Sequence, residues 1–493
     1  MGPSLERWSE ALSEAGKFST WAHNKSFAHT LRLVATGAGS SLPAICSLHR
    51  DYQRLSRFTN NPKICPQGLS TAACKGTCKM LLEQVPTGDL LIISDTTDLK
   101  WSHPSVEKNL TKTGYTTSNG TKAVGSGLLF HTALCFSPVD SYVHGIVEQF
   151  KITRNSNDVG KRINKKKVDY EDKESYKWQC VTETCFERLH EVKEKLVFVH
   201  DRESDVYEYM AYLIRNNLRF VIRGEQNRKV KSGGFLMDQF KDKLIDGLGS
   251  IVVEQKGGRP SRTAQLEFRA NQVTLLAPSR LKDVEQELTV NMLSIKEVGA
   301  PVGVTPMEWT LLTSEALVTA ENLQKVAYYY ACRWVIEEFH KCWKTSGSDV
   351  ESLRLEKVEN LERMSVTMAH AAVKIMQIRD TLLMSDLLRR KPDMIGITNE
   401  AKNEDTSCEG VVPEIGLKLL WIKYEPGKPF PKCPPSRRWL LNALARLGGW
   451  MDTRRTGRPA YSTLWKGWVR LQIMIETTVL LGSMDSGPKD LMK

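Results

Sequence analysis

The segment YACRWVIEEFHKCWK at residues 330–344 decides the fold prediction. Successive helical residues turn by roughly 100°, so Tyr330, Arg333, Glu337 and Lys344 fall within an arc of about 60°. The opposite side is apolar, which lets the helix bury one face and present a carboxylate among cations on the other. Ordinary i,i+4 surface pairing of Arg333 with Glu337 is the simplest explanation of such a face. Two further acidic residues argue for a more specific role.

Each of these acids ends an apolar run that reads as a buried strand. DLLIISD at residues 89–95 ends at Asp95, and KLVFVHD at residues 195–201 ends at Asp201. Continuous apolar runs of this length are typical of strands that are covered on both faces. A lone Asp at a strand end usually caps a turn. Three acids from distant parts of the chain, in this order, favour a shared site.

Composition favours a polyanionic partner. The chain of 493 residues has 69 Lys and Arg against 57 Asp and Glu, a net charge of +12 and a pI near 9.0. Residues 1–80 contain ten basic and four acidic residues, so this sixth of the chain carries half of the excess. Such an uneven positive charge is typical of nucleic-acid binding. We expect a basic N-terminal region and a polyanionic partner such as nucleic acid.

The eleven cysteines do not indicate zinc fingers or disulfides. Cys74 and Cys78 come nearest to a metal-binding spacing but have no partner pair, so reduced thiols are expected. No secretory segment and no run of 18 apolar residues occurs. We expect a soluble cytoplasmic protein, associated with the nucleoid of a bacterium and not with a membrane.

The order of elements predicts an α/β protein. After the Asp95 strand come a hairpin (residues 127–136 and 141–152), a helix, the Asp201 strand, a helix near 204–216 and a strand ending at Arg223. Gly-rich turns then separate apolar alternations, which indicates an antiparallel β insertion at about 224–315. This is the order of an RNase H-like mixed sheet. We predict a helical domain at 1–80, an RNase H-like catalytic domain at 81–364 and a helical domain at 365–493.

Three converging carboxylates predict a hard-metal site. Asp95, Asp201 and Glu337 offer only oxygen donors, which favour Mg²⁺, with Mn²⁺ as a substitute, over zinc. Two such ions roughly 4 Å apart would activate a water or a 3′-hydroxyl for phosphoryl transfer.

The same residues resemble the DDE transposases, and in particular their hairpin-forming cut-and-paste branch, which includes the transposase of the composite kanamycin-resistance transposon. The branch signature of Tyr, Arg, Glu and Lys at intervals of three, four and seven is matched by Tyr330, Arg333, Glu337 and Lys344. ISDTT around Asp95, HDRESD around Asp201 and ARLGGWMDTRRTG at 445–457 extend the likeness over residues 50–470.

The resemblance assigns a role to each matching residue. It implies that Asp95, Asp201 and Glu337 are the catalytic, metal-binding triad. It implies that the Tyr330, Arg333 and Lys344 side chains hold the phosphate beside the cleaved bond, and that Arg223 contacts another phosphate. Trp309 matches a residue that stacks on a flipped-out base while the DNA end closes into a hairpin. From its alternation with Met307 and Leu311 alone, Trp309 would be a core residue.

The two ends of the chain are expected to bind DNA and a second protomer. In the N-terminal domain, the family's basic end-reading segment is replaced by NKSFAHTLRLV at residues 24–34, and Arg32 and Arg57 are the contacts we assign. Arg454 is a further candidate, for which a solvated basic turn is the alternative. The segment from Trp465 to the C-terminus resembles the part through which family members form homodimers in a synaptic complex.

The sequence therefore predicts a metal-dependent transposase, an endonuclease and strand transferase acting on transposon ends and target DNA without a nucleotide cofactor. Hydrolytic nicking, hairpin formation, hairpin opening and 3′-hydroxyl attack on target DNA would follow one another. Two alternatives stay open at this point. One is a nuclease of the same fold without strand transfer, and the other is a DNA-binding regulator without catalysis.

Overall fold

A computed structural model describes residues 5–15, 20–37, 39–118, 121–139, 141–154, 168–253, 262–390, 407–409, 411–451, 453 and 459–485. Arg454 and most of the predicted polar loop at 396–412 lie outside these residues. No helix of the described part is both long and apolar enough to cross a membrane.

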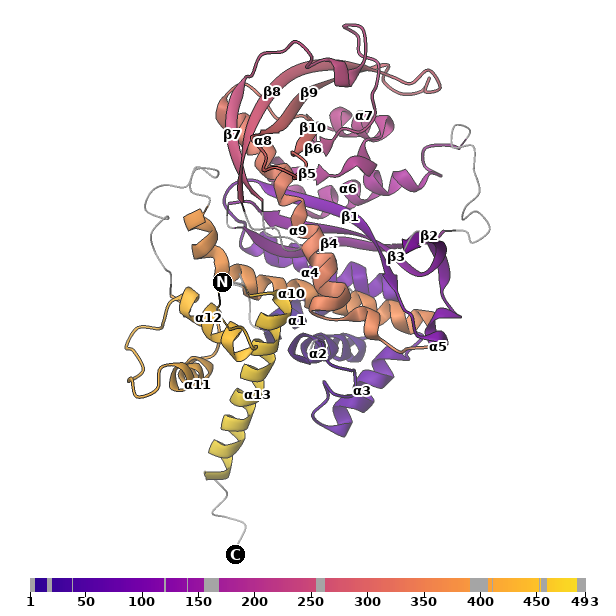
Figure 1. The fold of residues 1–493 in the computed structure, drawn as a ribbon. Coiled ribbons are helices and arrows are strands. Elements are labelled where there is room, and N and C mark those ends of the chain that lie inside the picture. Colours follow the sequence, from indigo (N-terminus) through magenta and orange to yellow (C-terminus); the bar gives the residue numbers. More distant parts are fainter. Residues whose placement is uncertain are drawn as a thin grey trace, which may run out of the picture.

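A ten-stranded mixed sheet forms the centre of the molecule (Figure 1). The strand order is β2-β3-β1-β5-β6-β10-β9-β8-β7, and β4 pairs with β3. The strands of the core are β1 (Leu90–Lys100), β2 (Thr111–Ser118), β3 (Thr121–Ser137), β4 (Tyr142–Ile152), β5 (Leu196–His200) and β6 (Arg219–Arg223). Strand β1 is antiparallel to β3 and parallel to β5, which is parallel to β6. This mixed sheet with flanking helices confirms the predicted RNase H-like class.

The predicted β insertion extends the same sheet. It consists of β7 (Gly247–Val253), β8 (Arg262–Leu276), β9 (Glu287–Val298) and β10 (Glu308–Thr313). These strands are antiparallel to one another, and β10 joins the core by pairing antiparallel with β6. Figure 1 shows the insertion at the top of the molecule. It therefore continues the core sheet past Arg223 and brings Trp309 beside it.

Side chains of the central strands alternate between two apolar layers. In β1, Leu91 and Ile93 join one hydrophobic cluster, and Leu90 and Ile92 join the other. The second layer is completed by α6 (Lys177–Arg188) and α7 (Tyr207–Arg215). Since side chains alternate with a period of two in a strand, both faces of β1 are buried, as its continuous apolar run predicts.

The first layer joins both ends of the chain to the sheet. Its N-terminal helices are α1 (Leu5–Glu14), α2 (Trp21–Gly37), α3 (His49–Thr59) and α4 (Pro66–Glu83). Its later helices are α8 (Ala320–Cys332), α9 (Trp334–Lys341), α10 (Val358–Arg390), α11 (Glu414–Tyr424), α12 (Arg437–Leu447) and α13 (Tyr461–Asp485). The three-domain division stays a prediction, with α10 running through its boundary at 364–365.

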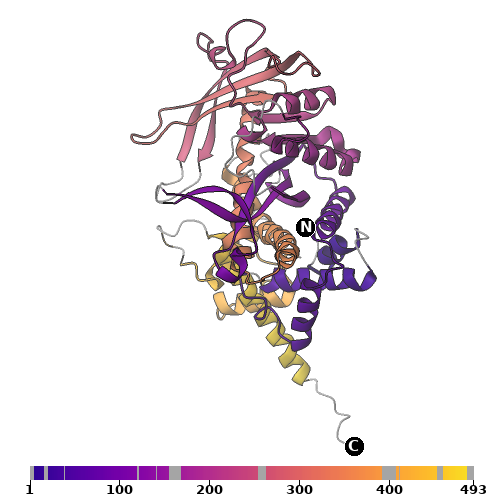
Figure 2. The same ribbon diagram turned by 90° about the vertical axis from the view of Figure 1, so that its right-hand side faces the viewer.

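The helix predicted at 330–344 is divided into three parts. Helix α8 ends at Cys332 and α9 begins at Trp334, with hydrogen bonds of the tighter i to i+3 type from Arg333 N–H to Tyr330 O (3.0 Å) and from Ile336 N–H to Arg333 O (3.1 Å). The widened π-type turn η6 (Cys342–Ser346) follows and contains Lys344. Turns of this kind are frequent at functional sites. Figure 2 shows α8 and α9 running from the insertion towards α10.

Candidate metal and phosphate site

Asp95 does not end its strand, as the sequence suggested, but lies in the middle of β1 and pairs with Thr132 of β3. The polar residues after Ile93 remain part of the strand because β3 still pairs with them. Pairing with β5, however, reaches only from Leu90 to Ile93. Asp95 therefore lies beyond the end of that pairing, on the same face of β1 as Leu91 and Ile93.

Asp201 directly follows β5, the strand that runs parallel to β1. The pairing of the two strands ends at Ile93 and Val199, each two residues before an aspartate. The charge of Asp201 raises the pKa of Asp95, so the two carboxyl groups are neighbours. One oxygen of Asp201 also accepts the backbone N–H of Glu203 (2.9 Å), which caps a short 3₁₀ turn (Arg202–Ser204). Asp201 thus has the turn-capping role expected of a lone Asp, together with its place beside Asp95.

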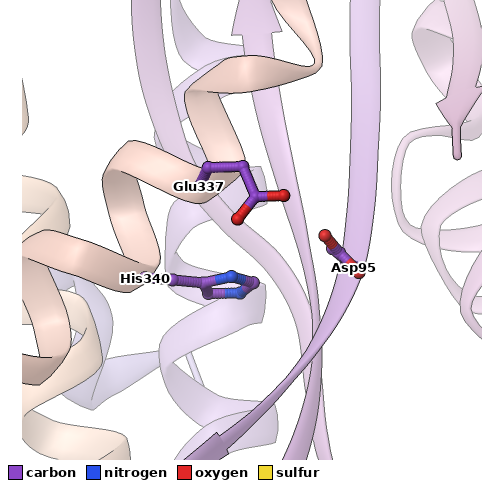
Figure 3. Close-up of side chains that lie close together, drawn as sticks. All are labelled: Asp95, Glu337 and His340. Atoms are coloured by element: carbon purple, nitrogen blue, oxygen red, sulfur yellow. The ribbon is translucent and has the colours of Figure 1, made fainter. Parts of the chain in front are cut away.

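Helix α9 brings Glu337 to the same place, together with His340 (Figure 3). One donor atom each from Asp95, Glu337 and His340 lie within 4.8 Å of one another. Asp201 is outside this trio. His340 was not singled out from the sequence, although its i,i+3 spacing from Glu337 is the signal that could have found it.

The guanidinium of Arg333 connects the two carboxylates. Its Nη1 lies 3.3 Å from Asp95 Oδ2, and its Nη2 lies 3.3 Å from Glu337 Oε1. The side chain of Arg333 is only 15% exposed. Its contacts are therefore not solvated surface ion pairs, which contribute little stabilisation. Arg333 therefore belongs to the site itself, between strand β1 and helix α9.

Burial and like charge make the two aspartates hard to ionise. Burial raises the pKa of Asp95 to about 7, the neighbouring charge of Asp201 raises it too, and Arg333 acts against both. Burial also raises the pKa of Asp201, opposed by the Glu203 N–H and by Arg333. Strong shifts in a cluster of carboxyls are characteristic of functional sites. Positive charge in this space would stabilise the ionised forms.

Of the other predicted phosphate-binding residues, Lys344 contacts strand β1 and Tyr330 contacts Trp309. Lys344 Nζ lies 3.6 Å from Oδ1 of Asp98, which is three residues beyond Asp95 on β1. Although burial opposes the change, the ammonium groups of Lys100 and Lys344 lower the pKa of Asp98. The aromatic rings of Trp309 and Tyr330 meet edge to face with centroids 5.0 Å apart. Burial raises the pKa of Tyr330, and the charges of Arg223 and Arg333 act in the opposite direction.

Tyr330 and Trp309 differ in burial. Tyr330 is 5% exposed, whereas Trp309 is partly buried against the core. Trp309 therefore combines the core packing that its strand alternation suggests with an exposed part next to Tyr330.

The N-terminal candidates lie in the helical layer. Arg32 on α2 donates a hydrogen bond to Ser9 Oγ of α1 (3.0 Å), and Arg57 on α3 is exposed. Their assignment to DNA stays a prediction, and Arg454 lies outside the described residues.

The sheet order and this cluster define an RNase H-like core with an acidic site at the end of its parallel strands. Residues 179–374 match the family model for the transposase DDE domain, a segment that contains Asp201 and Glu337 and begins after Asp95. This match supports a transposase with a metal-binding DDE motif.

One solved structure is also similar. A cryo-EM structure of the piggyBac transposase synaptic complex with hairpin DNA aligns with 84% of this chain and 85% of its own chain, at 10% identity and a TM-score of 0.35. At that level of likeness, no property of that complex extends to this chain.

Proposed function

We propose that this protein is a DNA transposase of the hairpin-forming cut-and-paste type. The observation that carries the proposal is the approach of Glu337 on α9 to Asp95 on β1, with Asp201 directly after the neighbouring parallel strand and its charge acting on Asp95. The match of residues 179–374 to the transposase DDE domain supports the broader part of this proposal, a transposase.

The acidic residues fit divalent cations. Asp95, Asp201 and Glu337 would hold Mg²⁺ or Mn²⁺, because buried carboxylates of like charge need compensation and prefer hard cations. When bound, two ions would lower the pKa of a water or 3′-hydroxyl. They would also stabilise the negative charge on the leaving oxygen. The protein side chains would position the phosphate and prevent it from binding in other orientations.

Three cationic side chains would position the scissile phosphate. Arg333 presents a planar fork, which suits two phosphate oxygens, and it is held in place by Asp95 and Glu337. Lys344 adds a point charge from η6, on the β1 side of the site. Arg223 at the end of β6 would be the third, since it acts on Tyr330 while its Nη2 donates to Glu308 O (3.3 Å). Tyr330 would donate its hydroxyl to the same phosphate.

The exposed part of Trp309 would stack on an extruded base. Extrusion costs a few kcal/mol, and an aromatic face offsets it. Tyr330 supports the indole edge to face and keeps it beside the phosphate site. Base extrusion and strand cleavage would then occur on adjoining surfaces.

Synapsis of two DNA ends would involve both terminal regions. The basic helices at residues 1–80, with Arg32 and Arg57, would bind the transposon end. Helix α13 exposes Ile473, Val479 and Leu481 by 57% each, which is unusual for large apolar side chains in a free surface helix. We assign this helix to the homodimer contact.

A strand-transfer assay tests the proposal. The purified protein is incubated with Mg²⁺, a labelled duplex taken from the DNA flanking its gene, and a supercoiled target plasmid. We expect hairpin intermediates and joined products, all absent in Asp201→Asn and Glu337→Gln and retained in Asp238→Asn, whose carboxylate pairs with Lys241 in the insertion. Nicks without joined products would indicate a nuclease. Binding without cleavage, unchanged in both active-site variants, would indicate a regulator.

A further inference from the structure

We propose that His340 binds the same metal ion as Asp95 and Glu337, so that the site contains a nitrogen donor as well as carboxylate oxygens. This inference rests on the proposed function, since it adds one ligand to that site. It concerns a residue that the carboxylate pattern alone does not include.

The geometry is close to that of a shared ion. Donor atoms of Asp95, Glu337 and His340 lie within 4.8 Å of one another. Donors bound to one octahedral ion at about 2.1 Å are about 4.2 Å apart when opposite and about 3.0 Å apart when adjacent. The three side chains would therefore draw closer together when an ion binds. Figure 3 shows the His340 ring extending from α9 below Glu337 towards Asp95.

The burial of His340 supplies an independent argument. His340 is only 6% exposed, and its Nε2 is buried with no hydrogen-bond partner among the described residues. A buried polar atom without a partner is costly, and such atoms call for an explanation such as an ion. Coordination of a cation in the space next to Asp95 and Glu337 provides one.

Other buried histidines show which part of this pattern is distinctive. His131 Nδ1 pairs with Thr96 Oγ1 (2.8 Å), and His200 Nε2 pairs with Tyr209 O–H (3.0 Å), so each ring has one hydrogen-bonded nitrogen, while its other nitrogen is buried without a partner. His370 on α10 also has a buried Nε2 without a partner, but it is not part of any cluster of metal-binding side chains in the described chain. His340 combines the unpaired nitrogen with two carboxylates. His370 is therefore its matched control.

A nitrogen ligand changes the expected metal preference. Imidazole suits first-row transition metals, whereas Mg²⁺ prefers oxygen donors. With His340 in the coordination shell, Mn²⁺ should bind more tightly than Mg²⁺, and removal of the imidazole should reduce this difference. A ring that serves only as packing would leave the preference unchanged.

Pulsed EPR of Mn²⁺ bound to the full-length protein without DNA tests the inference. We expect a ¹⁴N coupling that changes to a ¹⁵N coupling when the protein is produced with ¹⁵N-histidine, which requires no substitution. His340→Gln should abolish the coupling and weaken Mn²⁺ binding by about tenfold, while His370→Gln should preserve both. Thermal unfolding of each variant reports whether it is folded.

The outcomes separate this inference from the proposed function. Bound Mn²⁺ without histidine coupling, or a coupling that persists in folded His340→Gln, would overturn the role of His340 and leave the carboxylate site intact. Failure of the parent protein to bind Mn²⁺, or binding that is unchanged in Asp95→Asn and Glu337→Gln, would refute the metal site on which the proposed function depends.

Discussion

Arg333 Nη1 lies 3.3 Å from Asp95 Oδ2, although the two residues are 238 positions apart in the chain. The contact connects the strand that supplies the first carboxylate to the helix that supplies the last. Because the same guanidinium also contacts Glu337 at 3.3 Å, its position fixes the relative orientation of both acids.

Arg333→Lys should lower DNA cleavage by about 10²-fold, the scale for losing one preorganised charged donor at a reacting centre. A lysine cannot reproduce the two-pronged contact with Asp95 and Glu337. Single-turnover cleavage measures the effect, and equilibrium DNA binding should change little. Arg215→Lys, in an exposed pair with Glu285, is the control. Equal cleavage by parent and Arg333→Lys would rule out this role.

Asp95→Asn should abolish cleavage yet stabilise the metal-free protein by about 1 kcal/mol. The reason is that Asp95 is a buried carboxylate beside Asp201, with a pKa raised to about 7. Urea unfolding at pH 8 in EDTA measures the gain. Asp98→Asn should destabilise instead, because Asp98 pairs with Lys100 (2.8 Å) and Lys344. A destabilised Asp95→Asn protein would contradict this account of the site.

Acid should reduce the stabilisation that Arg219 provides through its ion pairs with Asp89 and Glu315. Arg219 binds Asp89 (2.8 Å) and Glu315 (2.7 Å). Despite opposing burial, its guanidinium lowers the pKa of both acids. Carboxyls with a lowered folded pKa stabilise the protein above their unfolded values, near pH 4, and lose that contribution as pH falls further.

Arg219→Gln should therefore cost about 3 kcal/mol of unfolding free energy at pH 7 and much less at pH 2. Chemical denaturation at the two pH values gives the difference. Arg215→Gln removes a more exposed pair and should have a small effect at both. A penalty for Arg219→Gln that is independent of pH would mean that packing, not charge, dominates there.

Trp309→Ala should block hairpin formation more than the first nick. Without the indole, the extruded base loses roughly 1–3 kcal/mol of stacking, whereas the carboxylates keep their positions. Time courses on a labelled end resolve the two steps, and Trp309→Phe should recover most of the hairpin product. If Trp309→Ala slowed both steps equally, the side chain would be acting through the core or the phosphate site.

Ile473→Asp should convert a dimer into a monomer. Placing a charge in an apolar contact is strongly unfavourable, and Ile473 is 57% exposed in the single chain. Light scattering coupled to gel filtration measures the mass, with and without DNA. Lys466→Asp on the same helix serves as the comparison for added negative charge. A dimer that survives Ile473→Asp would place the contact elsewhere.

Local pattern predicted much of the fold. The apolar runs at 89–95 and 195–201 and the alternation at 127–152 predicted the central strands, since burial on one or both faces leaves a direct mark on the sequence. The insertion was predicted from its turns and appears as β7–β10. The strand β2 was missed because TKTGYTTS has no apolar alternation and depends on pairing with β3.

The sequence predicted which residues belong to the site better than it predicted how they are arranged. Tyr330, Arg333, Glu337 and Lys344 were selected as one face of a regular helix, yet the chain tightens at Arg333 and widens at η6. Asp95 was expected at a strand end, but β3 extends β1 beyond it. His340 was overlooked because its neighbour in space, Asp95, is distant in the chain.

By itself, the sequence determined which segments are apolar enough to be buried and which acids follow them, because burial and charge are properties of local composition. Only the tertiary structure decided that the strands before residues 95 and 201 lie side by side, that Arg333 spans two carboxylates and that an imidazole lies near them. Those relationships depend on strand register and helix packing, where contacts between distant parts of the chain fix positions that local preferences leave undetermined.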